Sequence, residues 1–126
     1  MRQMFLLFSH NLTPAQIEDA KKNWNITHFI PLPNELQELW SNIPPDCNDI
    51  EKFLEPIYDW LIKNSKQKDL ALIQGDFGAT CKIASFAKKI GLIPVYATTK
   101  RNAIEKIIDG KVVKTSTFEH IMYRKF

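Results

Sequence analysis

Three short apolar runs constrain the fold of this chain most, because each ends abruptly in small, hydroxyl-bearing or charged residues. They predict strands over Met4–Phe8, Asp69–Gln74 and Leu92–Ala97. Runs of this length with such boundaries are typical of buried strands. The sequence therefore predicts the interior of a sheet, with polar groups gathered where its strands end.

The segments between these runs carry helical signals. Thr13–Gln16 matches a capping box with proline at the first helical position, which predicts a helix to about Asn23. Apolar residues at helical spacing predict an amphipathic helix over residues 50–65, with Pro56 either kinking it or starting its main body. A further helix is expected over Phe77–Ile90. A short strand over 27–30 and a brief helix over 33–40 complete this part.

The C-terminal region carries a hairpin signal. Asp109–Gly110 is a favoured two-residue turn between the apolar segments 104–108 and 112–114, and a last strand is expected over Phe118–Tyr123. Strands that alternate with helices imply a parallel sheet with helices on both faces. The prediction is one α/β domain over residues 1–126, with a mostly parallel sheet flanked by helices and a C-terminal antiparallel β-hairpin.

Charge and composition narrow the function classes. Residues 1–63 hold five Lys or Arg and nine Asp or Glu, whereas residues 64–126 hold twelve and five. This asymmetry favours an anionic partner on one side, although solvated surface lysines also explain much of it. No apolar run is long enough to span a membrane and no secretion signal is visible, so we expect a cytoplasmic protein. Scattered histidines and two separate cysteines predict no metal site.

The segment Gln74–Thr80 is the first candidate site. Its glycines, Gly75 and Gly78, stand where a strand passes into a helix, a place suited to a phosphate. It matches neither the Walker A loop nor the dinucleotide fingerprint, and the alternative is a tight turn that needs two glycines for its geometry. Asp76 could cap the helix, bind a ribose or adenine, or act as a base. Phe77 is expected in the core, yet its place in this segment also makes it a candidate ligand contact.

Two further strand ends carry reactive groups. Thr98–Arg101 is expected to form a turn in which two hydroxyls, an ammonium and a guanidinium can hold phosphates. The alternative is an exposed loop before the hairpin. Ser9 and His10 end the first strand, where an imidazole can exchange protons near neutrality. Because no carboxylate cluster is present, any phosphodiester cleavage here is expected to proceed without a metal.

These residues resemble a known family. The segments Leu7–His10, Gln74–Thr80 and Ile93–Arg101 are similar to those of the small ring nucleases of type III CRISPR systems. The resemblance covers the whole chain and implies a single CRISPR-associated Rossmann-like domain that needs no cofactor. It also implies a homodimer that binds cyclic tetra-adenylate across its two-fold axis, with no membrane or duplex nucleic acid as partner. In such enzymes a ribose 2′-OH attacks the adjacent phosphodiester and leaves a 2′,3′-cyclic phosphate.

The resemblance also implies residue roles. His10 would transfer a proton, with Asp76 as the other candidate, and Lys100 or Arg101 would offset developing charge. Larger relatives carry a Ser or Thr and a basic residue where Ser9 and Lys100 stand, whereas His10 has no general counterpart there. The remaining contacts to phosphate, ribose or base would come from Ser9, Gln74, Gly75, Phe77, Gly78, Ala79, Thr80, Thr98 and Thr99.

Three other functions fit the same residues. A module that binds a cyclic oligoadenylate without cutting it needs the same phosphate contacts. A flavodoxin-like domain for another mononucleotide would use the same strand ends. In a plain interaction domain, Lys100 and Arg101 would contribute neither to ligand binding nor to activity. The hairpin at Asp109–Gly110 could serve as a dimer contact, a lid or a sheet edge.

Overall fold

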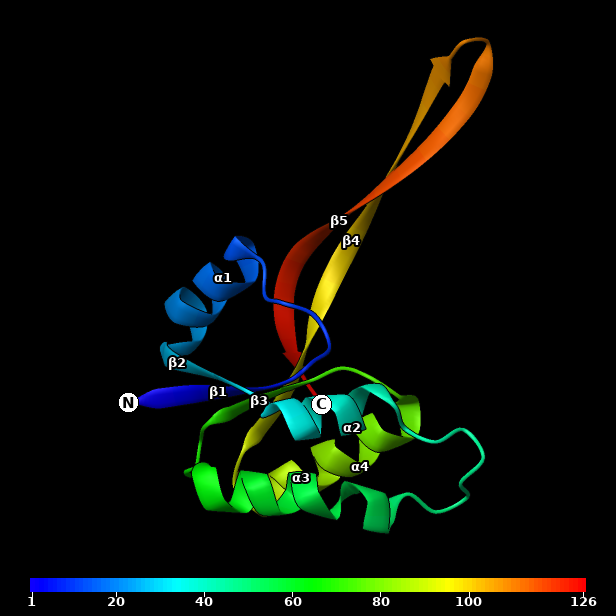
Figure 1. The fold of residues 1–126 in the computed structure, drawn as a ribbon. Helices are drawn as coiled ribbons and strands as arrows, with labels where there is room; N and C mark the ends of the chain where they lie inside the picture. The colour runs from blue at the N-terminus through cyan, green and yellow to red at the C-terminus, as the bar shows by residue number, and fades with distance from the viewer.

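The computed structural model describes residues 1–126 as a mixed α/β domain built on one five-stranded sheet (Figure 1). The strand order is β2-β1-β3-β4-β5, in which the first four strands are parallel and β5 runs antiparallel to β4. The strands are β1 (Arg2–Leu7), β2 (Ile26–Pro31), β3 (Leu70–Ile73), β4 (Ile93–Ile108) and β5 (Lys111–Lys125). The predicted mostly parallel sheet with an antiparallel C-terminal strand pair is confirmed.

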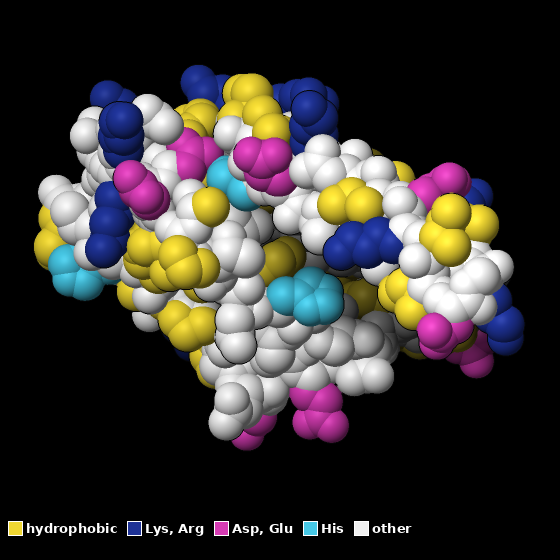
Figure 2. All heavy atoms as spheres, turned by 90° about the horizontal axis from the view of Figure 1, so that it is seen from above, with side chains coloured by type: hydrophobic (Ala, Val, Ile, Leu, Met, Phe, Trp, Pro, Cys, Tyr) yellow, Lys and Arg dark blue, Asp and Glu magenta, His cyan; other side chains and the backbone are white.

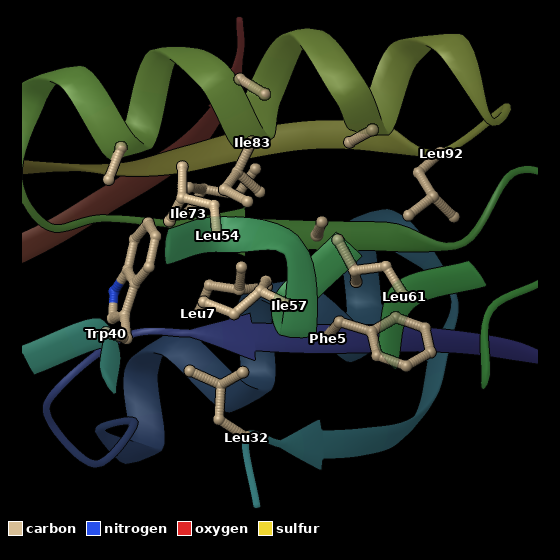
Figure 3. Packing of buried hydrophobic residues seen from close by; sticks show 14 of the residues in the cluster. Phe5, Leu7, Leu32, Trp40, Leu54, Ile57, Leu61, Ile73, Ile83 and Leu92 are labelled. Atoms are coloured by element: carbon tan, nitrogen blue, oxygen red, sulfur yellow. The ribbon is translucent and has the colours of Figure 1, made fainter. Parts of the chain in front are cut away.

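Helices cover both faces of this sheet. On one face α1 (Pro14–Trp24) packs on a buried cluster that includes Met4 and Val95. On the other face lie α2 (Asn34–Ser41), α3 (Glu51–Asn64) and α4 (Phe77–Lys89), over a larger cluster that includes Phe5 (Figure 3). The sheet is thus the middle of three layers, which is what alternating strands and helices predict.

Local sequence signals set most element boundaries. The Thr13 hydroxyl accepts from the Gln16 backbone N–H at 3.2 Å, and the Gln16 side chain accepts from the Thr13 N–H at 2.8 Å. This is the predicted capping box. Helix α3 runs continuously from Glu51 to Asn64 with Pro56 inside, so its body begins before the proline.

The prediction for the fourth strand was wrong about where it ends. Strand β4 does not stop at Ala97 but continues to Ile108 and pairs along its length with β5. The turn itself is confirmed, since Asp109 and Gly110 both have positive φ, at 52° and 75°. The sequence does not reveal the strand beyond Ala97, because both faces of the strand meet solvent there. It therefore needs no alternation of apolar and polar residues.

The far part of this hairpin, residues 101–118, projects from the body and is called the arm below (Figure 1). Every arm residue except Asn102 is exposed, including Ile107, Val112 and Phe118. No helix of the chain packs on the arm in Figure 1. A two-stranded ribbon of this kind is marginally stable on its own in water.

Candidate functional site

The loops that follow β1 and β3 meet at one edge of the sheet, called the rim below. They enclose a pocket of about 230 Å³ that is lined by Phe8, Ser9, His10, Gln74 and Gly75, called the polar pocket. The carboxyl ends of adjacent parallel strands are where open α/β sheets bind ligands. The structure therefore brings together two of the three predicted strand ends.

Ser9 and His10 are exposed in this pocket. The Ser9 hydroxyl lies 3.1 Å from the Ser41 hydroxyl, so α2 holds it in place. The His10 ring stands edge-on to Phe8, with ring centroids 5.4 Å apart. Its nitrogens make no hydrogen bond within the chain, so a ligand in this pocket can contact them.

Gln74 ties the rim together. Its backbone N–H donates to Leu7 O at 3.0 Å, and its carbonyl accepts from the Trp40 indole at 3.1 Å. Its side-chain oxygen accepts from the Ala97 N–H at 3.1 Å. The side-chain amide nitrogen has no partner in the chain, so Gln74 keeps donors for a ligand while it connects β1, β4 and α2.

The two glycines of the loop have different reasons to be glycine. A Cβ on Gly75 would stand 2.9 Å from the buried Trp40 ring, so packing inside the chain excludes any larger residue. A Cβ on Gly78 would meet only ordinary contacts, 3.5 Å from Asp76 and 3.8 Å from Ile50. Nothing within the chain requires glycine at position 78, which is consistent with space kept for a ligand.

Asp76 caps the start of α4. Its carboxylate accepts from the Ala79 N–H at 3.0 Å and so caps the helix, one of the three predicted alternatives. Ala79 itself is buried. The Thr80 hydroxyl is buried without a hydrogen-bond partner, an arrangement that costs free energy unless a further group binds there.

A second pocket, of about 420 Å³, lies beside the first and shares Gln74 and Gly75 with it. It is called the aromatic pocket below. Its lining consists of Ile73, Gln74, Gly75, Phe77, Thr80, Cys81, Tyr96 and Phe126. The expectation that Phe77 belongs to the core was wrong, because 93% of this residue is exposed. The sequence analysis missed Tyr96 and Phe126 as site residues, since only the return of β5 along β4 brings them together.

The third predicted strand end is not a turn, which corrects the expectation for Thr98–Arg101. These residues lie within β4, and none of them lines the polar or the aromatic pocket. The Thr98 hydroxyl donates to Met122 O and accepts from Met122 N–H, at a bulge in the strand pair. The Arg101 guanidinium contacts the Ser116 hydroxyl at 3.0 Å, and Lys100 stands opposite Glu119.

Basic side chains do not gather at one point near the rim. Seen from above, Lys and Arg are scattered over this face among acidic and apolar side chains (Figure 2). A further hollow of about 560 Å³ between the loop after β1 and α2 is also lined by Ser9 and His10, together with apolar and amide side chains. The site in one chain therefore offers hydroxyl, amide and imidazole groups rather than a cluster of cations.

A hydrogen bond between a histidine and a carboxylate at the base of the arm was not predicted from the sequence. The His120 ring nitrogen lies 2.7 Å from Asp19 of α1, and the two side chains are only 5% and 13% exposed. Nearby, the Tyr123 hydroxyl donates to Gln16 O at 2.9 Å, and burial together with the Asp19 charge raises the pKa of Tyr123. These contacts join β5 to α1 and have no local sequence signal, because 101 positions separate His120 from Asp19.

Comparison with known proteins gives one family. A family profile described as "Uncharacterized protein MJ1673 family" matches residues 2–124. This chain belongs to that family. A relative from Methanocaldococcus jannaschii, described as "Uncharacterized protein MJ1673", is 55% identical over 126 residues, which cover 100% of this chain and 98% of the relative. No solved structure matches the chain.

No group of three or more His, Cys, Asp or Glu side chains is placed to hold a metal ion. Both cysteines, Cys47 and Cys81, are free and exposed. None of the helices has the length and apolar character needed to cross a membrane.

Proposed function

We propose that this chain is a cytoplasmic ring nuclease of type III CRISPR systems, with a CRISPR-associated Rossmann-like domain that binds and cleaves cyclic tetra-adenylate. The observation that carries the proposal is the polar pocket, in which Ser9 and His10 face Gln74 and Gly75 beside the start of α4. A hydroxyl, an imidazole and an amide converge there at the edge of a parallel sheet, and this set suits a phosphodiester and its ribose.

In the proposed reaction the ribose 2′-oxygen attacks the neighbouring phosphorus and the bond from phosphorus to the 5′-oxygen breaks. The 2′-OH loses its proton, the leaving 5′-oxygen gains one, and a 2′,3′-cyclic phosphate remains. The exposed His10 imidazole serves as the base for the 2′-OH, and Ser9 orients the ribose. Positioning the three reacting atoms in line supplies much of the rate, because the attack is intramolecular.

The proposal includes a homodimer with the ligand on its two-fold axis, and the arm supports it. Apolar side chains such as Ile107, Val112 and Phe118 are exposed there on a ribbon that needs further packing. A second copy would supply that packing. The roles expected of Lys100 and Arg101 depend on the dimer, since neither side chain lines the polar or the aromatic pocket of its own chain.

A non-cleaving sensor of cyclic oligoadenylate is the second candidate. One observation favours it: no Lys or Arg lines the polar pocket, so one chain alone offers no cation to the charge that develops on the phosphate. Asp76, the other candidate base, is already engaged in capping α4.

Single-turnover incubation of excess protein with labelled cyclic tetra-adenylate and EDTA tests both candidates. We expect linear products that end in a 2′,3′-cyclic phosphate. His10→Ala should slow cleavage by about 10²- to 10⁴-fold with little loss of binding, as for other general bases. His28→Ala is the matched control, because His28 is exposed on β2 and lines neither site pocket. An intact ring at high protein concentration would leave only the sensor.

A further inference from the structure

The aromatic pocket lacks the chemistry of a phosphate site. None of its lining residues carries a charge, and five of the eight are hydrophobic. The Tyr96 and Phe126 rings lie with centroids 5.0 Å apart at an interplanar angle of 58°. The Arg124 guanidinium donates to the Tyr96 hydroxyl at 2.9 Å and thereby holds that ring in place. A flat, neutral group suits this pocket better than an anion does.

Phe77 stands at the edge of this pocket with no partner inside the chain. It is the first residue of α4, and 93% of it is exposed. A helix start accepts polar residues readily, so neither helix formation nor core packing accounts for a phenyl ring there. A ring exposed beside an aromatic pocket is well placed to stack on a flat ligand.

Thr80 adds a polar group to the same wall. Its hydroxyl is buried and has no partner in the chain, although a buried hydroxyl normally donates or accepts a hydrogen bond. Gln74 also belongs to this lining, and its side-chain amide nitrogen has no partner in the chain. Together they offer donors and an acceptor next to an aromatic surface, which is the pattern that recognises the edge of a nucleobase.

We propose that the aromatic pocket binds one purine base of the ligand, stacked on Phe77 and hydrogen-bonded by the Thr80 hydroxyl. This inference rests on the proposed function and deepens it. Because Gln74 and Gly75 line both pockets, a base in the aromatic pocket places its ribose and phosphate toward Ser9 and His10. The bound base thus fixes the position of the cyclic ligand relative to Ser9 and His10.

The test measures the affinity of cyclic tetra-adenylate by calorimetry for the wild type, Phe77→Ala, Phe77→Trp and Thr80→Val. Loss of one stacking ring should weaken binding by about 5- to 150-fold, and Phe77→Trp should restore it. Thr80→Val keeps the shape of the side chain and should weaken binding by about 2- to 10-fold. Ile62→Ala removes an apolar side chain that is 56% exposed on α3 and lines neither pocket, so it should leave affinity unchanged.

A second ligand separates this inference from the proposed function. Adenosine 5′-monophosphate should shift the amide NMR signals of Thr80 and Tyr96, whereas ribose 5-phosphate should not. Binding of the monophosphate there without binding of the cyclic ring supports the base site and overturns the proposed function. Equal affinity of Phe77→Ala and wild type for the ring overturns the base site alone. Unchanged affinity with a changed oligomeric state would show that a second copy covers Phe77, which also overturns it.

Discussion

At the rim, β1 and β3 end between two layers of buried side chains, whereas in the arm β4 and β5 continue with solvent on both sides. Residues of the rim are held by contacts that reach across the chain, such as Gln74 to Leu7, Trp40 and Ala97. Residues of the arm contact mainly their partners in the opposite strand. The long-range contacts of the rim can hold reacting groups in fixed positions. The arm, which lacks such contacts, suits association with a second chain.

Truncating one buried and one exposed isoleucine tests this comparison most strongly. Ile73→Ala, at the fully buried end of β3, should lower the free energy of unfolding by about 2–5 kcal/mol. Ile107→Ala, on the arm and 78% exposed, should change it by about 0.5 kcal/mol or less. Urea denaturation followed by tryptophan fluorescence measures both.

The same pair also tests the dimer. If the arm packs against a second copy, Ile107→Ala should weaken association in sedimentation experiments while it leaves the monomer stable. A large loss of monomer stability in Ile107→Ala would show that the arm packs on its own body, contrary to the structure.

Breaking the contact between His120 and Asp19 tests the junction of arm and body. His120→Ala removes the hydrogen bond at Asp19 Oδ2, while Asn23 still donates to Asp19 Oδ1 at 2.7 Å, so we expect a loss of about 1.5–3 kcal/mol in unfolding free energy. Hydrogen exchange should rise in α1 and at the base of β5 but not in β1 or β3. An equal rise in all strands would mean that the junction is part of the core and does not separate two regions.

Replacing each of the two rim glycines by alanine tests whether packing or ligand binding requires glycine at that position. Gly75→Ala forces a methyl group against Trp40 and should cost about 1–3 kcal/mol of unfolding free energy. Gly78→Ala should be neutral or stabilising by up to about 1 kcal/mol, because alanine favours the helix and the space is open.

If Gly78 is kept for the ligand, Gly78→Ala should still weaken binding of cyclic tetra-adenylate, measured by calorimetry on a protein with unchanged thermal stability. Full affinity in Gly78→Ala would remove this residue from the site.

Local signals predicted the body well, and contacts between distant residues account for what they missed. The capping box at Thr13 and the turn at Asp109–Gly110 involve neighbouring residues, so the sequence displays them directly. The reason for glycine at position 75 lies in Trp40, on another helix. No local pattern reveals that contact. The strand beyond Ala97 exists because β5 pairs with it, which a pattern of buried and exposed residues cannot show.

Removing either of two exposed ion pairs is expected to change the stability of the protein least. Glu51 of α3 lies 2.8 Å from Lys82 of α4, and Glu105 lies 3.6 Å from Lys114 across the arm. Hydrogen bonds from Lys82 and Tyr58 lower the pKa of Glu51, and partial burial together with the hydrogen bond to Glu51 raises the pKa of Tyr58 to about 12. Because the pKa of Glu51 is depressed in the folded state, its contribution to stability is present above its ordinary value of 4.5 and is lost as the pH falls through the folded value.

We therefore expect Glu51→Gln to lower the melting temperature slightly at pH 7. The effect should shrink as the pH falls through the lowered pKa of Glu51, because protonation then weakens the same contact in the wild type. Glu105→Gln is the matched control on the arm. It should change the melting temperature less, since its pair is longer and joins two strands that no helix covers. High salt should shrink the difference between the two variants, because both pairs face solvent. A larger effect for Glu105→Gln would mean that the arm, and not the body, depends on its surface charges for stability.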